Sequence, residues 1–270
     1  MKPLDHEEIA RRLDHAERVG HQIGPVSQDF PSMTMADAYA IQRHWINLKL
    51  AAGRRIRGRK IGLTSRAMQS QLGIEIPDSG ILFDDMFFDD GDTIPAGRFI
   101  EPRIEVEIAF IMGKDLKGGD TGPDQVLAAT QSIAPAFEIL DTRFFRKDPV
   151  TGQPRTILDT ISDNAANAGI VLGAERHQPE TVDLKWTGAI VSLNGMVEET
   201  GLGAGVLGDP LLSMAWLANR LAEHGDYIRK GEVVLSGSFI RAIEARPGSH
   251  FTADFGPFGT LSCTFEQESP

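Results

Sequence analysis

The segment RIEVEIAF, residues 103–110, limits the possible folds more than any other stretch, because its side chains alternate between two chemical kinds. The apolar set consists of Ile104, Val106, Ile108 and Phe110. The other set includes Glu105 and Glu107. A period of two predicts a β-strand with one apolar and one charged face. Two carboxylates about 7 Å apart on one face repel each other. The charged face therefore meets water, pairs with a Lys or Arg, or holds a metal ion.

A third carboxylate interrupts another apolar stretch. Glu138 lies within IAPAFEILD, residues 133–141, which also has the composition of a strand. A lone buried glutamate is costly unless it is paired or coordinated. Three carboxylates from two strands offer only oxygen ligands, which suit Mg²⁺ or, as the alternative, Mn²⁺. Spacing alone leaves open a salt bridge from one of these glutamates to Arg103 or Arg143.

Two further residues are candidates for chemistry. Lys60 lies in GRKIGLTS, residues 58–65, where an Ile, a Gly and two hydroxyl residues follow it closely. That pattern suits a tight strand or loop facing a pocket, although most lysines are simply exposed. Asp78, in IPDSG, is the second candidate, and Pro-Asp-x-Gly is also ordinary turn chemistry.

Charge and composition narrow the function classes. The net charge of −11 argues against a nucleic-acid partner, because phosphate binding needs clustered cations. Cys263 is the single cysteine, which excludes an internal disulfide framework and a cysteine zinc site. No apolar run approaches the length of a membrane span, and the charged start has no signal core. We therefore expect a soluble cytoplasmic protein without a membrane partner.

The order of helical and strand patterns predicts an α+β chain. Residues 1–75 are expected to form a helical N-terminal part and residues 76–270 a β-rich catalytic core, together one functional unit. Helices are predicted at 6–21, after Thr34 with Asp37 as an imperfect capping box, and along Met214, Leu217, Ala218 and Leu221. Strands are predicted at 99–112, 133–140, 186–193, 232–236 and 260–265. Asn194-Gly195 between two of the apolar runs predicts a two-residue hairpin.

Taken together, several motifs resemble one known family. They are KIGLTSRAMQ, PDSG, LFDDMFF, FIEPRIEVEIAF, PAFEILDTR and DTISDNAANAGIVLG. This set is similar to the hydratase/decarboxylase branch of the fumarylacetoacetate hydrolase-like superfamily, through nearly the whole chain. The resemblance implies a mixed β-roll or sandwich core with a helical N-terminal part. It also implies that Glu105, Glu107 and Glu138 bind the metal, that Lys60 is the catalytic lysine, and that Asp78 is an acidic pocket residue.

The activity that the resemblance implies is a metal-dependent hydration. Water would add to 2-oxo-hept-3-ene-1,7-dioate, arriving as the 2-hydroxy-2,4-dienoate, to give 4-hydroxy-2-oxoheptane-1,7-dioate in homoprotocatechuate (4-hydroxyphenylacetate) catabolism. Lys60 would shuttle protons if the nearby cation and partial burial lower its pKa toward neutrality, and Asp78 would orient Lys60 or the attacking water. One departure bears on pocket shape: relatives commonly carry an aromatic residue where this chain has Ser79.

Substrate contacts are predicted less sharply. The far carboxylate of such a diacid requires a cation, and the sequence does not choose among Arg66, Arg103, Arg143 and Arg241. Thr64, Ser162 and Asn164 are predicted to hydrogen-bond to the substrate. For Ser162 and Asn164 a purely structural role in closing turns is the alternative.

Other functions stay open at this point. A 4-oxalocrotonate-type decarboxylase or a 2-hydroxypentadienoate hydratase would use the same carboxylates. A non-catalytic partner that stabilises such an enzyme is a different class, and retention of the carboxylates and Lys60 argues against it. A carbon–carbon hydrolase is weaker, because no His–Glu pair can be placed. The resemblance also implies a homo-oligomer.

Overall fold

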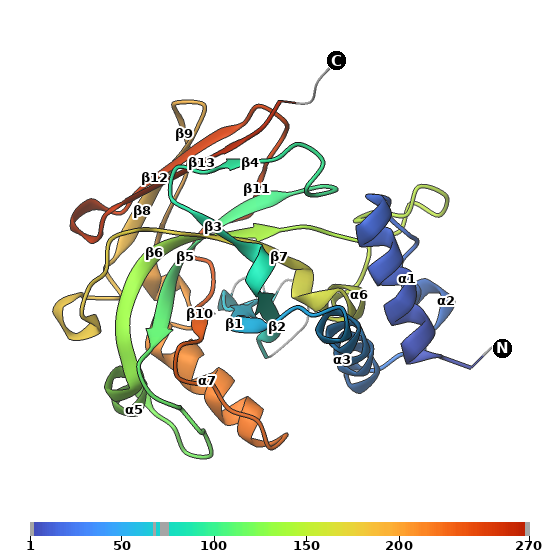
Figure 1. Cartoon of the computed structure of the whole chain (residues 1–270), viewed down its shortest axis with the longest axis horizontal. Helices are drawn as coiled ribbons and strands as arrows, with labels where there is room; N and C mark the ends of the chain where they lie inside the picture. The colour runs from blue at the N-terminus through green and yellow to red at the C-terminus, as the bar shows by residue number, and fades with distance from the viewer. Residues whose placement is uncertain (1–2, 67–68, 71–75, 268–270) are drawn as a thin grey trace.

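Two β-sheets and a group of N-terminal helices form successive layers in the computed structural model, which describes residues 3–66, 69–70 and 76–267 (Figure 1). The larger, eight-stranded sheet has the order β2-β1-β10-β5-β6-β7-β3, with β11 paired to β5. Its strands are β1 (Ile56–Gly62), β2 (Asp78–Phe83), β3 (Phe87–Asp89), β5 (Arg103–Met112), β6 (Thr130–Leu140), β7 (Asn167–Leu172), β10 (Val233–Leu235) and β11 (Ile243–Glu244). The five-stranded sheet contains β4 (Thr93–Ile94), β13 (Thr260–Phe265), β12 (His250–Asp254), β8 (Gly188–Leu193) and β9 (Met196–Leu202), in that order. The predicted α+β class with a mixed β core is confirmed.

The predicted two faces of the 103–110 strand are both present in β5. Its apolar side chains are wholly buried and belong to a cluster shared with residues of the smaller sheet, such as Val191 and Phe251. The charged face of the strand points to the other side of the larger sheet, toward the helices. The strand begins at Arg103 rather than at the predicted residue 99, because Pro102 has no N–H to give to a sheet.

Helices α1 (His6–Val19), α2 (Val26–Asp29) and α3 (Met35–Ala51) cover the second face of the larger sheet (Figure 1). Their apolar stripes form a second cluster with β2, in which Trp45 meets Phe83 edge to face. The predicted capping box of α3 is present, since Thr34 Oγ1 accepts the Asp37 N–H and Asp37 Oδ2 accepts the Thr34 N–H. Val19, the last residue of α1, is 54% exposed.

The remaining helices are α5 (Pro123–Ala129), α6 (Ile157–Ser162) and α7 (Pro210–Ala222). α7 begins with Asp209 as its cap and buries Met214, Leu217 and Ala218, as predicted, against the core between the sheets. The Asn194-Gly195 hairpin joins β8 to β9, with Leu193 opposite Met196 and positive φ at both turn residues. That hairpin prediction is confirmed. Among the described helices, none combines the length and the apolar character needed to cross a membrane.

The predicted division of the chain at residue 75 falls outside the described residues and stays a prediction. β1 lies before that point, yet it is an internal strand of the larger sheet, antiparallel to β2 and parallel to β10. Residues 56–62 are therefore built into the sheet rather than into the helical layer. This placement brings Lys60 into the middle of the molecule.

Candidate metal centre

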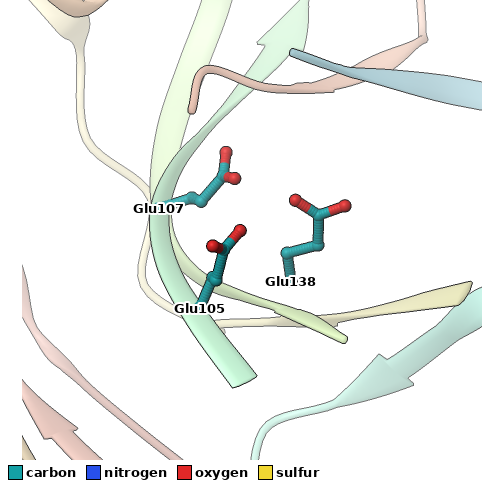
Figure 2. Close-up of side chains that lie close together, drawn as sticks. All are labelled: Glu105, Glu107 and Glu138. Carbon is teal, nitrogen blue, oxygen red and sulfur yellow. The ribbon is translucent and has the colours of Figure 1, made fainter. Parts of the chain in front are cut away.

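Three glutamate side chains meet on the helix-facing side of β5 and β6 (Figure 2). Glu105 and Glu107 come from β5, two positions apart on one face, and Glu138 of β6 is the register partner of Glu105. One carboxylate oxygen from each lies within 4.8 Å of the other two. Glu107 and Glu138 are buried, and Glu105 is partly buried. The structure therefore assembles the carboxylate group that the sequence suggested.

Two groups that the sequence did not single out hold these carboxylates in place. The Gly237 N–H donates to Glu107 Oε2 at 2.6 Å, and Asn167 Nδ2 donates to Glu138 Oε1 at 2.7 Å. Both donors are remote in sequence from their acceptors, so local patterns carried little signal for them. The only sequence signal for Asn167 was its position as an amide inside the otherwise apolar run of β7.

An unusual left-handed turn positions Asn167. Asn164, Ala165 and Ala166 have φ values of 55°, 52° and 58°, a conformation that residues other than glycine seldom adopt. The Asn164 side chain stabilises the turn, because its Oδ1 accepts the Ile81 N–H at 2.8 Å and its Nδ2 donates to the Ile81 carbonyl at 2.9 Å. The turn thus ties β7 to β2 and sets the direction of Asn167 at the start of β7.

Lys60 and Asp78 lie beside the glutamates on neighbouring strands. Lys60 Nζ is 3.5 Å from Glu138 Oε1 and 3.8 Å from Asp78 Oδ1. Gly62, opposite Asp78 in the β1–β2 ladder, has to lack a side chain here. A Cβ at that position would lie 2.2 Å from Asp78 Oδ1 and 2.7 Å from Lys60 Nζ. The sequence predicted Lys60 and Asp78 as partners, and the structure brings them together.

The glutamates are strongly perturbed by burial and by one another. Burial, followed by the charge of Glu138, raises the pKa of Glu105 to about 8. The same two causes raise the pKa of Glu107 well above its ordinary value. Burial also raises the pKa of Asp78, against the opposing effect of Lys60. So many carboxylates in one buried place favour either protonation or a bound cation.

Opposing effects act on the pKa of Lys60 in the metal-free protein, whereas the sequence-based expectation of a lowered value assumed a cation beside it. Burial lowers it, but the charges of Glu138, Asp78, Glu105 and Glu107 together raise it above its ordinary value. In the metal-free protein Lys60 is therefore an ammonium group held by carboxylates, not a lysine tuned toward neutrality. The pKa of Lys60 depends on four carboxylates from three strands, and spacing along the sequence does not reveal that these groups lie together.

The residues fit a divalent metal. The donor set consists of carboxylate oxygens, which suits Mg²⁺ and Mn²⁺. Glu138 Oε2 is buried and has no hydrogen-bond partner among the described residues, and the same holds for Asp78 Oδ1. A buried carboxylate oxygen without a partner is costly, and a cation bound to Glu138 removes that cost.

Several known proteins are similar to this chain over nearly its whole length. No family model matches the chain. It is 50% identical over 260 residues to 2-oxo-hept-4-ene-1,7-dioate hydratase of Escherichia coli, covering 96% of this chain and 97% of the relative. It is 38% identical to 2-keto-4-pentenoate hydratase of Paraburkholderia xenovorans (strain LB400), over 98% of this chain and 97% of that protein.

The chain belongs to the hydratase/decarboxylase branch of the fumarylacetoacetate hydrolase-like superfamily. A solved structure of 4-oxalocrotonate decarboxylase from Pseudomonas putida G7, complexed with magnesium and adipate, superposes with a TM-score of 0.89. The two sequences are 35% identical, and the match covers 98% of this chain and all of that one. A protein of this branch with the same fold thus binds a divalent metal.

Within the hydratase/decarboxylase fold, the weaker sequence candidates are occupied by internal contacts. Ser162 Oγ donates to the Leu158 carbonyl at 2.8 Å inside α6, and the Asn164 side chain binds Ile81. These contacts match the structural alternative of turn closure. Thr64 is buried against Gly237, where a Cβ would lie 2.3 Å from Thr64 Oγ1. A substrate contact of these three residues stays a prediction.

The four candidate arginines are in different environments. Arg66 is exposed, and Arg241 is exposed and pairs with Glu198 and Glu199. Arg143 is buried and pairs with Asp163. Arg103 lies on the same face of β5 as the metal-centre glutamates. Its Nε has no hydrogen-bond partner among the described residues, and Glu244 lies opposite it in the β5–β11 ladder.

Ser79, the departure from the family pattern, contacts an aromatic residue from another element. Tyr39 of α3 hydrogen-bonds to Ser79, and its pKa is raised by burial and by the charge of Asp78. Gln42, one turn further along α3, donates to the Ser79 carbonyl at 2.9 Å. An aromatic ring is therefore present next to Asp78, supplied by the helix layer instead of by β2.

Proposed function

We propose that this chain is a metal-dependent hydratase that adds water to a seven-carbon 2-oxo-ene-dioate in the catabolism of aromatic compounds. The observation that carries the proposal is the buried set Glu105, Glu107 and Glu138 with Lys60 Nζ 3.5 Å from Glu138 Oε1. Support for hydration over decarboxylation comes from the 50% identity to the dioate hydratase, against 35% to the decarboxylase. The product is 4-hydroxy-2-oxoheptane-1,7-dioate.

The double bond of the substrate determines which proton transfers are needed. The relative's name places it between C4 and C5, whereas the sequence-based expectation was the 3-ene. The two are tautomers, because loss of a proton from C3 and gain of one at C5 converts the 4-ene into the 3-ene. Only the 3-ene is conjugated with the C2 carbonyl, so water adds at C4 of that form, and C3 then takes up a proton.

The residues supply these transfers as follows. Glu105, Glu107 and Glu138 would hold a divalent cation, Mg²⁺ or as the alternative Mn²⁺, which would supply positive charge to stabilise the enolate of the 2-oxo acid. Lys60 gives up and takes back the proton that moves between C3 and C5. Asp78, 3.8 Å from Lys60 Nζ, orients the ammonium group or positions the attacking water.

Replacing Lys60 tests its role directly. Lys60→Met keeps an unbranched side chain only one atom shorter but cannot carry a proton, so turnover is expected to fall by about a hundredfold or more. Metal binding, measured by calorimetric titration with Mn²⁺, should persist because the three glutamates remain. Near-normal turnover of this variant would remove Lys60 from the mechanism.

A coupled ultraviolet assay tests the reaction itself. Fresh 2-hydroxyhepta-2,4-diene-1,7-dioate is mixed with the protein, with Mg²⁺ or with EDTA, while CO₂ is monitored. Metal-dependent loss of the dienol with 4-hydroxy-2-oxoheptane-1,7-dioate as product and no CO₂ is expected. Release of CO₂ would instead make the chain a decarboxylase on the same carboxylates. No reaction in either condition would contradict both enzymatic proposals.

We also propose that the enzyme is a cytoplasmic homo-oligomer without a nucleic-acid partner. Self-association is supported by exposed apolar side chains on the outer strands of the smaller sheet. They are Ile190, Met196, Val197 and Leu202. The net charge of −11 disfavours nucleic-acid binding. Light scattering coupled to gel filtration distinguishes an oligomer from a monomer of 29.5 kDa.

A further inference from the structure

Three arginines gather beyond one end of the glutamate group. Arg103, the first residue of β5, lies on the same face as Glu105 and opposite Leu140, the last residue of β6. The strand rise places Arg103 about 7 Å from Glu105 along β5. Arg103 therefore follows the metal centre in the direction in which β6 ends.

The other two arginines belong to the loop that leaves β6. The Arg155 N–H donates to the Arg146 carbonyl at 3.0 Å, and Lys147 pairs with Pro154, so residues 146–155 form a hairpin between β6 and α6 (Figure 1). Arg146 Nη2 donates to the Glu101 carbonyl at 3.0 Å, just before β5. Arg155 Nη1 donates to Thr142 Oγ1, just after β6. Both guanidinium groups are thus anchored at the ends of the two strands that carry the glutamates.

Only one of these three guanidinium groups, that of Arg146, forms an ion pair with a described carboxylate. Arg146 pairs with Glu101, at 3.3 Å from its Nε to Oε1, and its side chain is only 20% exposed. Arg103 and Arg155 make no ion pair with any described residue, and Arg103 Nε is buried without a hydrogen-bond partner there. Partly buried cations without partners are costly, which favours an additional anion at this place.

The neighbouring carboxylates each have other partners. Glu244, opposite Arg103 in the β5–β11 ladder, pairs with Arg246 at 3.0 Å, and the pKa of Glu244 is lowered by Arg246 and, less strongly, by Arg103 and Arg146. Asp141 accepts the Ile100 and Glu101 N–H groups at 2.9 and 2.7 Å. Asp163 pairs with Arg143. Asp159 accepts hydrogen bonds from the backbone and side chains of two further residues, Ser27 and Thr156.

The cluster is electrostatically connected to the reaction centre. The charge of Arg146 lowers the pKa of Glu105 against its burial, and that of Arg155 does the same for Asp78. Burial, Arg155 and Arg103 in turn lower the pKa of Arg146 to about 10, so the three cations act on one another.

We propose that Arg103, Arg146 and Arg155 form the binding site for the second carboxylate of the substrate and make the enzyme selective for dicarboxylates. The inference rests on the proposed function, and it assigns the end of the substrate that the metal centre leaves unbound. Six carbon–carbon bonds of about 1.5 Å give a seven-carbon diacid a span of roughly 7–8 Å. That span is comparable with the separation of about 7 Å between Glu105 and Arg103 along the strand. Guanidinium groups bind carboxylates through paired, charge-assisted hydrogen bonds.

The test compares two ligands that differ only in the far carboxylate. Binding of 2-oxoheptanedioate and of 2-oxoheptanoate to the Mg²⁺-loaded protein is measured by calorimetric titration. The wild type is expected to bind the diacid about 10- to 100-fold more tightly. Arg155→Gln and Arg146→Gln should each reduce this ratio by about tenfold or more, mainly through weaker diacid binding. In the assay with the seven-carbon dienol, the same variants should show a raised KM.

Arg11→Gln is the matched control, because Arg11 is an exposed arginine of α1 that pairs with Glu7 and Glu8. The ratio of its affinities for 2-oxoheptanedioate and 2-oxoheptanoate should equal that of the wild type. Melting temperatures verify folding of every variant, and Arg103→Gln provides an independent variant on β5 if the hairpin substitutions destabilise the protein. Arg155→Lys should recover part of the ratio.

The outcomes separate this inference from the proposed function. Turnover of the diacid with an unchanged binding ratio in all three cluster variants would overturn the arginine assignment and leave the hydratase intact. Equal affinity of the wild type for both ligands would overturn dicarboxylate selectivity. If the wild type neither turned over the dienol nor bound either ligand, the proposed function would fail first and the inference would fall with it.

Discussion

Two groups of buried charges near the helix layer are built in opposite ways. Arg143 and Asp163 form a closed pair, in which the guanidinium also donates to the Asp163 carbonyl and stacks over Trp45. At the metal centre, four carboxylates surround the single ammonium of Lys60. The pKa of Asp163 is raised by burial only to about 6, whereas that of Glu105 reaches about 8. We infer that the pair of opposite charges stabilises the fold, whereas the group with an excess of negative charge binds a cation.

Removing one metal-centre carboxylate should have the largest effect. Glu138→Gln preserves the shape of the side chain but replaces a buried anion beside Lys60 with a neutral amide. The proposed metal site then has only two carboxylates instead of three. We expect turnover to fall by about 1,000-fold or more, since charge stabilisation by a metal is worth several kcal/mol. Mn²⁺ titration and steady-state rates measure the change. Exposed Glu180→Gln is the matched control, and comparable activity of both variants would break the contrast.

The closed pair predicts a change in stability instead of chemistry. Arg143→Ala leaves Asp163 buried without its cation, which should lower the free energy of unfolding by about 3–5 kcal/mol. Urea unfolding measures it. The double variant Arg143→Ala/Asp163→Asn should recover part of the loss, because it removes the stranded charge. A loss below about 1 kcal/mol would mean that the pair is not structural.

A supporting contact of the metal centre should matter less than a ligand. Asn167→Ala removes the amide that donates to Glu138 Oε1, so the carboxylate loses its orientation while keeping its charge. We expect the affinity for Mn²⁺ to fall by about 10- to 100-fold. An affinity within threefold of the wild type would show that the left-handed turn before Asn167 has another purpose.

The smallest expected effect is a pH dependence of the stability of the metal-free protein. The pKa of Glu105 rises from an ordinary 4.5 to about 8 on folding, so between these values the folded chain holds more protons than the unfolded one. Stability is therefore greatest below about pH 4.5 for this group and is lost as the pH rises toward 8. In EDTA, Tm should drop on the order of 5 °C between pH 5 and pH 8.

A variant at position 105 isolates the contribution of Glu105 to this pH dependence of stability. Glu105→Gln cannot ionise, so its Tm should change less over the same range, and Mg²⁺ at pH 8 should raise the Tm of the wild type but not of the variant. A wild-type Tm that increased with pH in EDTA would contradict the sign of the shift.

The sequence carried the parts of this architecture that depend on local patterns. Alternation in residues 103–110 predicted both faces of β5, Thr34 and Asp37 predicted the start of α3, and Asn194-Gly195 predicted the hairpin. Placing Glu138 with Glu105 and Glu107 needed its position in an apolar run and the family resemblance.

What the sequence could not provide depends on distant contacts. Gly237 and Asn167 meet their glutamates only because β10 and β7 flank the β5–β6 pair. The pKa of Lys60 in the metal-free protein depends on carboxylates from three strands, which local patterns do not bring together. Arg146 and Arg155 were overlooked because their significance lies in the hairpin that brings them beside the ends of β5 and β6.

The position of β10 has a consequence for how the protein is made. Leu235 pairs with Lys60 on one side and with Ala109 on the other, so β10 is the strand that holds the lysine beside the glutamates. A nascent chain contains all three proposed metal-binding glutamates by residue 138, but Lys60 cannot be fixed next to them until residues 233–235 emerge. Contacts of such long sequence separation form slowly. The reaction centre is therefore completed late in translation, and a prematurely terminated chain would carry all the ligands without the geometry.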